Sequence, residues 1–150
     1  MRTFLVLTAI AVFAAPMATA RSYQASNGAV LRALDKITGR STDIEVSTNE
    51  PIIFGSLLVT VEACFRTPPE EPPESAAFVS ISSVPTSAAS TASGIIRQGD
   101  DGFSAEGAET RFSGWMFASS PGLNALEHSV YDVWVISCSA PSPVEGAVSE

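Results

Sequence analysis

The pattern of apolar and polar residues predicts a chain built from short β-strands. Two stretches near its start, 29–34 and 41–46, flank the turn-rich segment 35–40 and predict a β-hairpin. Gly39 is the expected left-handed position of this turn, because glycine has no Cβ to clash at positive φ. A shorter strand is expected at 52–54.

The clearest strand is predicted at 57–66, where side chains alternate with a period of two, a pattern that argues against a helix. One face carries the more apolar set: Leu57, Val59, Val61, Ala63 and Phe65. The opposite face carries Leu58, Thr60, Glu62, Cys64 and Arg66.

Further strands are expected at 76–82, 111–118 and 130–138. The segment 68–74 has four prolines and three glutamates, and predicts a stiff connector that cannot join the interior of a sheet. The segment 83–110 is rich in small and polar residues with little to bury, which predicts a long mobile loop.

Ser120 and Pro121 are suited to the cap and first position of one helical turn. Residues 139–150 are expected to form a disordered tail. The predicted fold is therefore all-β: one domain over 29–138, a small antiparallel β-sandwich or partly open barrel with one short helical turn.

Residues 1–20 have the pattern of a secretory signal peptide. Arg2 precedes an apolar run at 4–15, and Ala18-Thr19-Ala20 supplies the small residues of a cleavage site. The run is shorter than the roughly twenty residues that a membrane-spanning helix needs, although an uncleaved anchoring helix is the alternative. We expect export to the periplasm, no transmembrane segment after cleavage, and a flexible start at 21–28.

Cleavage removes Arg2 and leaves seven basic and sixteen acidic residues, a formal charge of −9. This balance argues against nucleic acid as a partner, because phosphates are bound by Lys and Arg. It also argues against anionic membrane surfaces. A cationic partner is compatible with the charge, but acidity alone also serves solubility.

Cys64 and Cys138 are the only cysteines. Two cysteines in one small exported domain are expected to form a disulfide, with free thiols or a redox pair as alternatives. The Cys-x-x-Cys spacing typical of a redox pair is absent.

Catalytic and cofactor motifs give little support for an enzyme. His128 is the only histidine, and a set with Ser119 or Ser120 and Asp132 can be written, but no Gly-x-Ser-x-Gly elbow is present. A Ser-Lys pair through Lys36 has a plainer explanation as a turn lysine. The zinc, haem and phosphate-loop patterns are absent, so no metal and no cofactor are expected.

The run Trp115, Met116 and Phe117 holds residue types that anchor protein interfaces but also fill cores. We expect two of the three to be buried and the third to be exposed. Whichever aromatic is exposed would supply the anchor, so the candidate binding residues are Trp115 and Phe117. An acidic rim is expected on the neighbouring connector, formed by Glu70, Glu71 and Glu74.

Several longer stretches resemble an alphaproteobacterial family catalogued as domain of unknown function 2155. They are Leu34-Asp35-Lys36-Ile37-Thr38-Gly39, the segment 112–121 (FSGWMFASSP) and the segment 130–134 (VYDVW). The likeness also includes Phe54-Gly55-Ser56-Leu57 and 68–78, so that it covers most of 29–138. The resemblance implies an exported envelope protein and brings no catalytic or ligand residues.

The function expected from the sequence is a non-catalytic periplasmic module that binds another envelope component, either a protein or a cell-wall polymer. Two alternatives remain at this point. One is a small periplasmic hydrolase using His128, and the other is a small-ligand binder in the mouth of a sandwich or barrel.

Overall fold

The computed structural model describes residues 22–85 and 95–139. The predicted signal peptide at 1–20, residues 86–94 of the predicted loop at 83–110, and residues 140–150 of the predicted tail at 139–150 lie outside the described residues. Within the described ranges every regular element is a strand. These ranges therefore contain no helix that could span a membrane.

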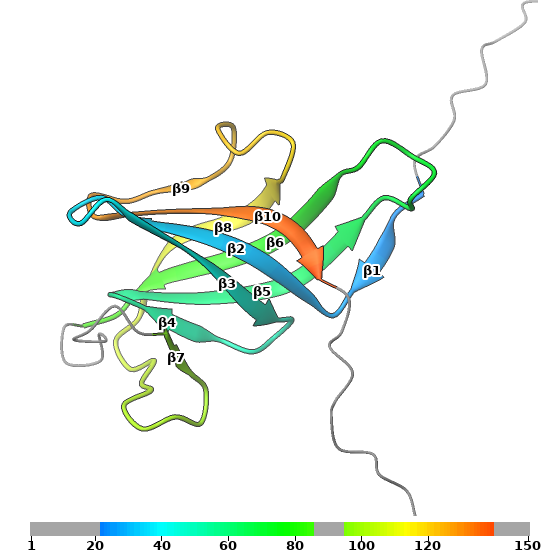
Figure 1. Ribbon diagram of the computed structural model, residues 1–150. Coiled ribbons are helices and arrows are strands. Elements are labelled where there is room, and N and C mark those ends of the chain that lie inside the picture. The colour runs from blue at the N-terminus through cyan, green and yellow to red at the C-terminus, as the bar shows by residue number, and fades with distance from the viewer. Residues whose placement is uncertain (1–21, 86–94, 140–150) are drawn as a thin grey trace, which may run out of the picture.

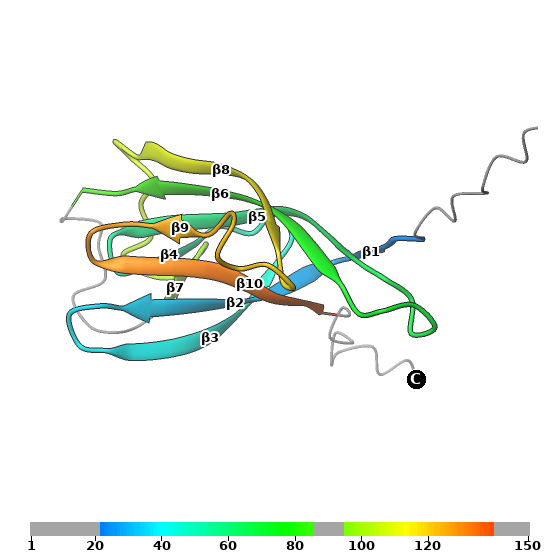
Figure 2. The same ribbon diagram turned by 90° about the horizontal axis from the view of Figure 1, so that it is seen from above.

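Antiparallel strands form two sheets that pack face to face without closing into a barrel (Figures 1 and 2). The larger sheet has the order β7-β4-β5-β6-β8, with β1 pairing with the far end of β5; the smaller has the order β3-β2-β10-β9. The all-β sandwich prediction is confirmed. The strands are β1 (Gln24–Ser26), β2 (Gly28–Asp35), β3 (Arg40–Ser47), β4 (Ile52–Phe54), β5 (Leu57–Arg66), β6 (Ser75–Ser83), β7 (Ile95–Arg97), β8 (Glu109–Phe117), β9 (Leu126–Glu127) and β10 (Tyr131–Ser139).

The predicted hairpin is present as β2 and β3, and Gly39 has a φ of 68°. Asp35 organises its turn: one carboxylate oxygen accepts the amides of Ile37 at 2.8 Å and Thr38 at 3.2 Å. The hydrogen bond from the Thr38 amide is the main cause that lowers the pKa of Asp35. The turn is held to the other hairpin of this sheet, because Lys36 forms an ion pair of 2.8 Å with Asp132.

The core lies between the two sheets and is made of aliphatic side chains from both inner faces. A disulfide between Cys64 of β5 and Cys138 of β10 crosses this core, with the two Cα atoms 5.7 Å apart. The predicted disulfide is confirmed, and it joins one sheet covalently to the other.

A β-bulge in β5 changes the predicted faces of this strand. The pairing of β5 with β6 shifts register between Val61 and Ala63, so that the alternation reverses after the bulge. Cys64 is therefore buried in the core, while Ala63 and Phe65 lie on the outer face with only partial burial. The prediction that Phe65 shares the face of Leu57 is wrong, because one extra residue moves every later side chain to the opposite face.

The expected burial of two residues in the run 115–117 is also corrected. Met116 alone is fully buried, at 1% exposure, whereas Trp115 is 40% exposed and Phe117 is half-buried. The second sheet packs on the inner face of β8, so no sheet lies over its outer face. Strict alternation then places Met116 in the core and both aromatic neighbours outside.

Two segments predicted as flexible or looped contain short strands. Residues 24–26, within the predicted flexible start at 21–28, pair with the end of β5. Residues 95–97, within the predicted loop at 83–110, pair with β4. Three residues are too few for a periodic signal. β1 forms on the unpaired edge of the longer β5, and β7 forms on the unpaired edge of β4, which is itself three residues long.

The expected helical turn after β8 is replaced by a turn in which the Leu123 amide donates to the Ser120 carbonyl at 3.1 Å. At the other side of the sandwich, an Arg97 guanidinium nitrogen of β7 donates to the Glu45 carbonyl of β3 at 3.1 Å. This hydrogen bond connects the edge strands of the two sheets.

Candidate functional site

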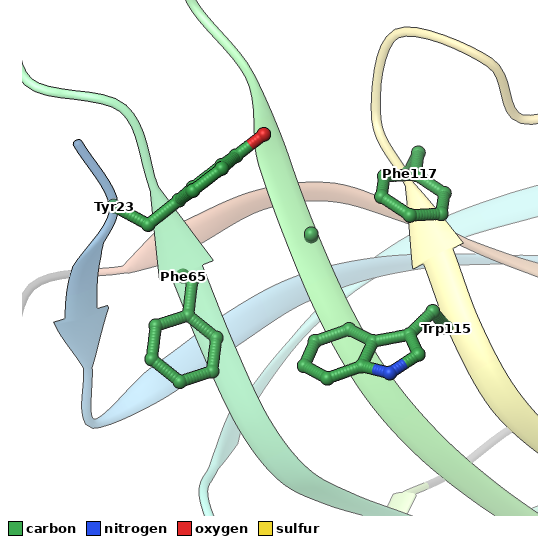
Figure 3. Close-up of a pocket in the computed structure, with 5 residues that line it drawn as sticks. Tyr23, Phe65, Trp115 and Phe117 are labelled. Carbon is green, nitrogen blue, oxygen red and sulfur yellow. The ribbon is translucent and has the colours of Figure 1, made fainter. Parts of the chain in front are cut away.

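The structure holds an open hollow of about 400 Å³ on the outer face of the larger sheet. It is lined by four aromatic side chains and one small residue: Tyr23, Phe65, Ala76, Trp115 and Phe117. We call these five residues the aromatic hollow. Figure 3 shows Tyr23 and Phe65 on one side of it and Trp115 and Phe117 on the other.

Strand register builds the aromatic hollow from residues that are distant in sequence. Phe65 of β5, Ala76 of β6 and Phe117 of β8 stand side by side across three strands. The side chain of Ala76 is much smaller than those of Phe65 and Phe117 on either side, so Ala76 forms the floor of the aromatic hollow. A larger residue at position 76 would fill the hollow.

The neighbouring row supports the Trp115 side chain. Phe78 is paired with Trp115 across the strands, and their rings meet edge to face with centroids 5.4 Å apart. Trp115 also lies 6.0 Å from Phe65, measured between ring centroids. These contacts fix the indole, while 40% of the residue stays exposed to solvent.

The rest of this outer face is covered or polar. Towards β4 and β7, the side chains of Ile96 and Phe103 pack over the buried Ile53. Between this cluster and the aromatic hollow lies a polar pair, in which the Ser80 hydroxyl donates to the Glu62 carboxylate at 2.5 Å. The aromatic hollow is thus a distinct apolar patch beyond a polar strip.

The acidic connector between β5 and β6 passes the end of the aromatic hollow. A carboxylate oxygen of Glu71 accepts the amide of Ser22 at 3.2 Å, directly before Tyr23. Glu74 accepts the amide of Ser119 at 3.2 Å and also the hydroxyl of the same serine, two residues after Phe117. Two carboxylates therefore stand next to the two aromatic walls.

The five predicted binding residues lie at one end of the molecule, but their roles differ. Trp115 and Phe117 line the aromatic hollow, and Glu71 adjoins it. Glu70 is exposed, whereas Glu74 is bound within the protein and also accepts the Ser75 amide at 2.9 Å. Sequence reasoning missed the remaining lining residues, Tyr23, Phe65 and Ala76.

Those residues were missed for structural reasons. Uninterrupted alternation predicts Phe65 on the face of Leu57, because no residue type marks the bulge before it. Tyr23 precedes a strand too short to predict, and an alanine such as Ala76 carries no signal of its own. The alternation along a strand was the one sequence signal able to place Trp115 and Phe117 on the same face.

His128 lies in the turn between β9 and β10 and takes part in the packing of that turn. Its Nδ1 accepts the Val130 amide at 3.3 Å, and its ring stacks on Tyr131 with centroids 6.0 Å apart. Within residues 22–85 and 95–139, no hydrogen bond joins the His128 ring to a serine hydroxyl or to Asp132. The suggested Ser-His-Asp set is not assembled there, and Asp132 is paired with Lys36.

Comparison with known proteins identifies one family. Residues 29–138 match the family described as "Uncharacterized protein conserved in bacteria (DUF2155)", which covers more than half of the chain. The resemblance to this family is therefore confirmed, as one of bacterial proteins. The chain matched none of the curated proteins and none of the solved structures.

Proposed function

Because the chain belongs to DUF2155, a bacterial family described as uncharacterised, we propose a function from its surface: it is an exported, non-catalytic module that binds another protein of the cell envelope. The observation that carries this proposal is the aromatic hollow. Trp, Tyr and Phe side chains around an open apolar recess are the residues that anchor protein interfaces.

Charge and shape support a protein partner. Glu71 adjoins the aromatic hollow, and the same connector carries the exposed Glu70, which supplies charged groups for the polar rim that usually surrounds an interface. The side chains of Phe65, Trp115 and Phe117 are held by paired strands of one sheet, so little of their conformational entropy is lost on binding.

Two observations support export. The apolar run at 4–15 followed by Ala18-Thr19-Ala20 has the order of a cleavable leader. The disulfide between Cys64 and Cys138 is of a kind that persists in oxidising compartments such as the periplasm.

Site-specific photocrosslinking in intact cells tests the proposal. A photoreactive phenylalanine analogue replaces Phe117 in the full chain, and a matched variant carries it at Ile37, which is 76% exposed on the β2–β3 turn. We expect a protein adduct from position 117 that is absent from position 37. Adding Ala76→Leu, which fills the floor, is expected to abolish the adduct without lowering the melting temperature.

Three results would contradict the proposal. They are an adduct that persists at full strength with Ala76→Leu, the same adduct from position 37, and no adduct from position 117 in correctly folded protein. An adduct with a cell-wall polymer or a small molecule would assign the hollow to one of the other two ligand classes.

A further inference from the structure

The walls and the rim of the aromatic hollow favour positive charge in different ways. The faces of Tyr23, Trp115 and Phe117 carry the negative part of the ring quadrupole, which attracts cations within about 6 Å. The Glu71 carboxylate stands beside the Tyr23 wall through its hydrogen bond with Ser22. A cation in the hollow would thus contact aromatic faces and would lie near the carboxylate of Glu71.

None of the described basic side chains lines the aromatic hollow. Arg66 follows Phe65, and alternation directs it to the opposite face of β5. The other basic side chains with ionic or hydrogen-bonded partners lie elsewhere: Arg32 with Asp43, Lys36 with Asp132, Arg97 with the Glu45 carbonyl, and Arg111 with Glu109. With a formal charge of −8 for the whole sequence, the complementary group comes from a partner.

Arginine fits this combination better than lysine or an aliphatic side chain. Its guanidinium is planar and weakly hydrated, so it stacks on aromatic faces at a small desolvation cost. Its five N–H groups also reach carboxylates in a fork geometry. A lysine ammonium is more strongly hydrated, and an aliphatic side chain would make no use of the carboxylates.

We propose that the aromatic hollow is a slot for an arginine side chain of the partner protein. The guanidinium lies against the Trp115 and Phe117 rings, and its N–H groups point towards Glu71 of the connector. This inference rests on the proposed function for the partner being a protein, and adds the side chain that the partner must present.

NMR titration of the isotope-labelled, purified full chain tests the slot with defined probes. The probes are N-acetyl-arginine methylamide, the lysine equivalent, and the citrulline equivalent, which keeps the shape of arginine without its charge. We expect arginine to shift the Trp115 indole N–H signal while that of Trp134, on the other sheet, stays in place. Citrulline should bind at least about fivefold more weakly, and lysine should also bind more weakly than arginine.

Variants separate charge from shape in the same titration. Glu71→Gln is expected to weaken arginine binding and leave citrulline binding unchanged, whereas Glu106→Gln, on an exposed loop, is expected to change neither. Ala76→Leu should remove binding of all three probes. Its melting temperature serves as the check that it folds.

The outcomes distinguish this inference from the function on which it rests. Citrulline or lysine binding as tightly as arginine would overturn the arginine slot, yet leave the hollow as a binding site. Failure of all three probes would also overturn the slot, even if crosslinking from position 117 still depended on Ala76. If that crosslinking did not depend on Ala76, the proposed function itself would be wrong.

Discussion

The phenol ring of Tyr131 occupies the space that a side chain on Gly55 would need. A Cβ built on Gly55 overlaps the hydroxyl oxygen and two ring carbons of Tyr131. The same ring meets Phe54 edge to face, with centroids 5.4 Å apart. The turn between β4 and β5 therefore packs directly against β10 of the other sheet, and Gly55 is required by space as well as by its φ of 58°.

Gly55→Ala is expected to destabilise the protein by roughly 2 kcal/mol or more, because backbone strain and the clash with Tyr131 add. Gly39→Ala is the matched control, since Gly39 has a similar φ of 68° and no atom within 4 Å of a built Cβ. We expect Gly39→Ala to cost about 1 kcal/mol, from backbone strain alone. Urea unfolding measures both, and equal losses would show that Tyr131 does not restrict position 55.

Removing the disulfide is expected to cost about 4 kcal/mol on the chain-entropy model, since 74 positions separate Cys64 from Cys138. The change is the double variant Cys64→Ala/Cys138→Ala, which leaves no free thiol. Unfolding in urea should show the loss, and a reductant should destabilise the natural protein but not the variant. A loss below about 1 kcal/mol would mean that the bond contributes little to stability.

Glu74→Ala is expected to lower the unfolding free energy by roughly 1–3 kcal/mol. The carboxylate accepts the amides of Ser75 and Ser119, and its loss leaves these donors without that partner. Glu70→Ala, in the same connector but exposed, is expected to change stability by less than about 0.5 kcal/mol. Neutralising Glu70, Glu71 and Glu74 together would therefore combine a loss of stability with any loss of binding. Equal changes in the unfolding free energy for Glu74→Ala and Glu70→Ala would contradict the structural role of Glu74.

Acid is expected to weaken the β2–β3 pairing through Asp43. A side-chain hydrogen bond from Arg32, at 2.6 Å, is the main cause that lowers the pKa of Asp43 in the folded protein. A lowered folded pKa stabilises the fold above the ordinary value of about 3.9, and that stabilisation is lost as the pH falls through the lowered value. Melting temperature followed from pH 6 to pH 2 should fall less steeply for Asp43→Asn than for the natural protein, and parallel curves would contradict this.

The exported protein is expected to begin at Arg21, after cleavage behind Ala20. The measurement is the intact mass of the protein purified from a periplasmic fraction, which should lack residues 1–20. Replacing Ala18 and Ala20 by bulky residues is expected to block processing, because signal peptidase requires small side chains there. Mature-length protein in the cytoplasm, or full-length protein held in the membrane without cleavage, would show that the leader has been misread.

The longer strands could be predicted from sequence because each has enough residues to show alternation. The prediction for 57–66 coincides with β5, and those for 76–82 and 130–138 differ from β6 and β10 by one residue at each end. The bulge in β5 could not be predicted, because it is a register shift in the pairing of β5 with β6 and no residue type marks it. The bulge moves Phe65 to the outer face. The side of the hollow opposite Trp115 therefore cannot be predicted from the alternation of apolar and polar residues.

The sequence predicts the acidic and the aromatic residues of the candidate site, but it does not predict that they lie close together. Trp115, Phe117 and Glu71 belong to segments whose composition points to a surface or an interface. Their closeness follows from the order β5-β6-β8, which puts the end of β8 next to the connector between the other two strands. Strand order depends on long-range pairing, which a local pattern does not contain.

The disulfide also decides how the domain would respond to a mechanical load. A force applied between the two ends of the chain passes through the bond from Cys64 to Cys138 and bypasses the covalent loop between them. That loop would otherwise lengthen the stretched chain by roughly 250 Å, at about 3.4 Å per residue. Phe65, Ala76, Trp115 and Phe117 all lie inside it. Pulling on the termini would therefore strip away β1 to β4 before it could extend the segment that carries four of the five residues of the aromatic hollow.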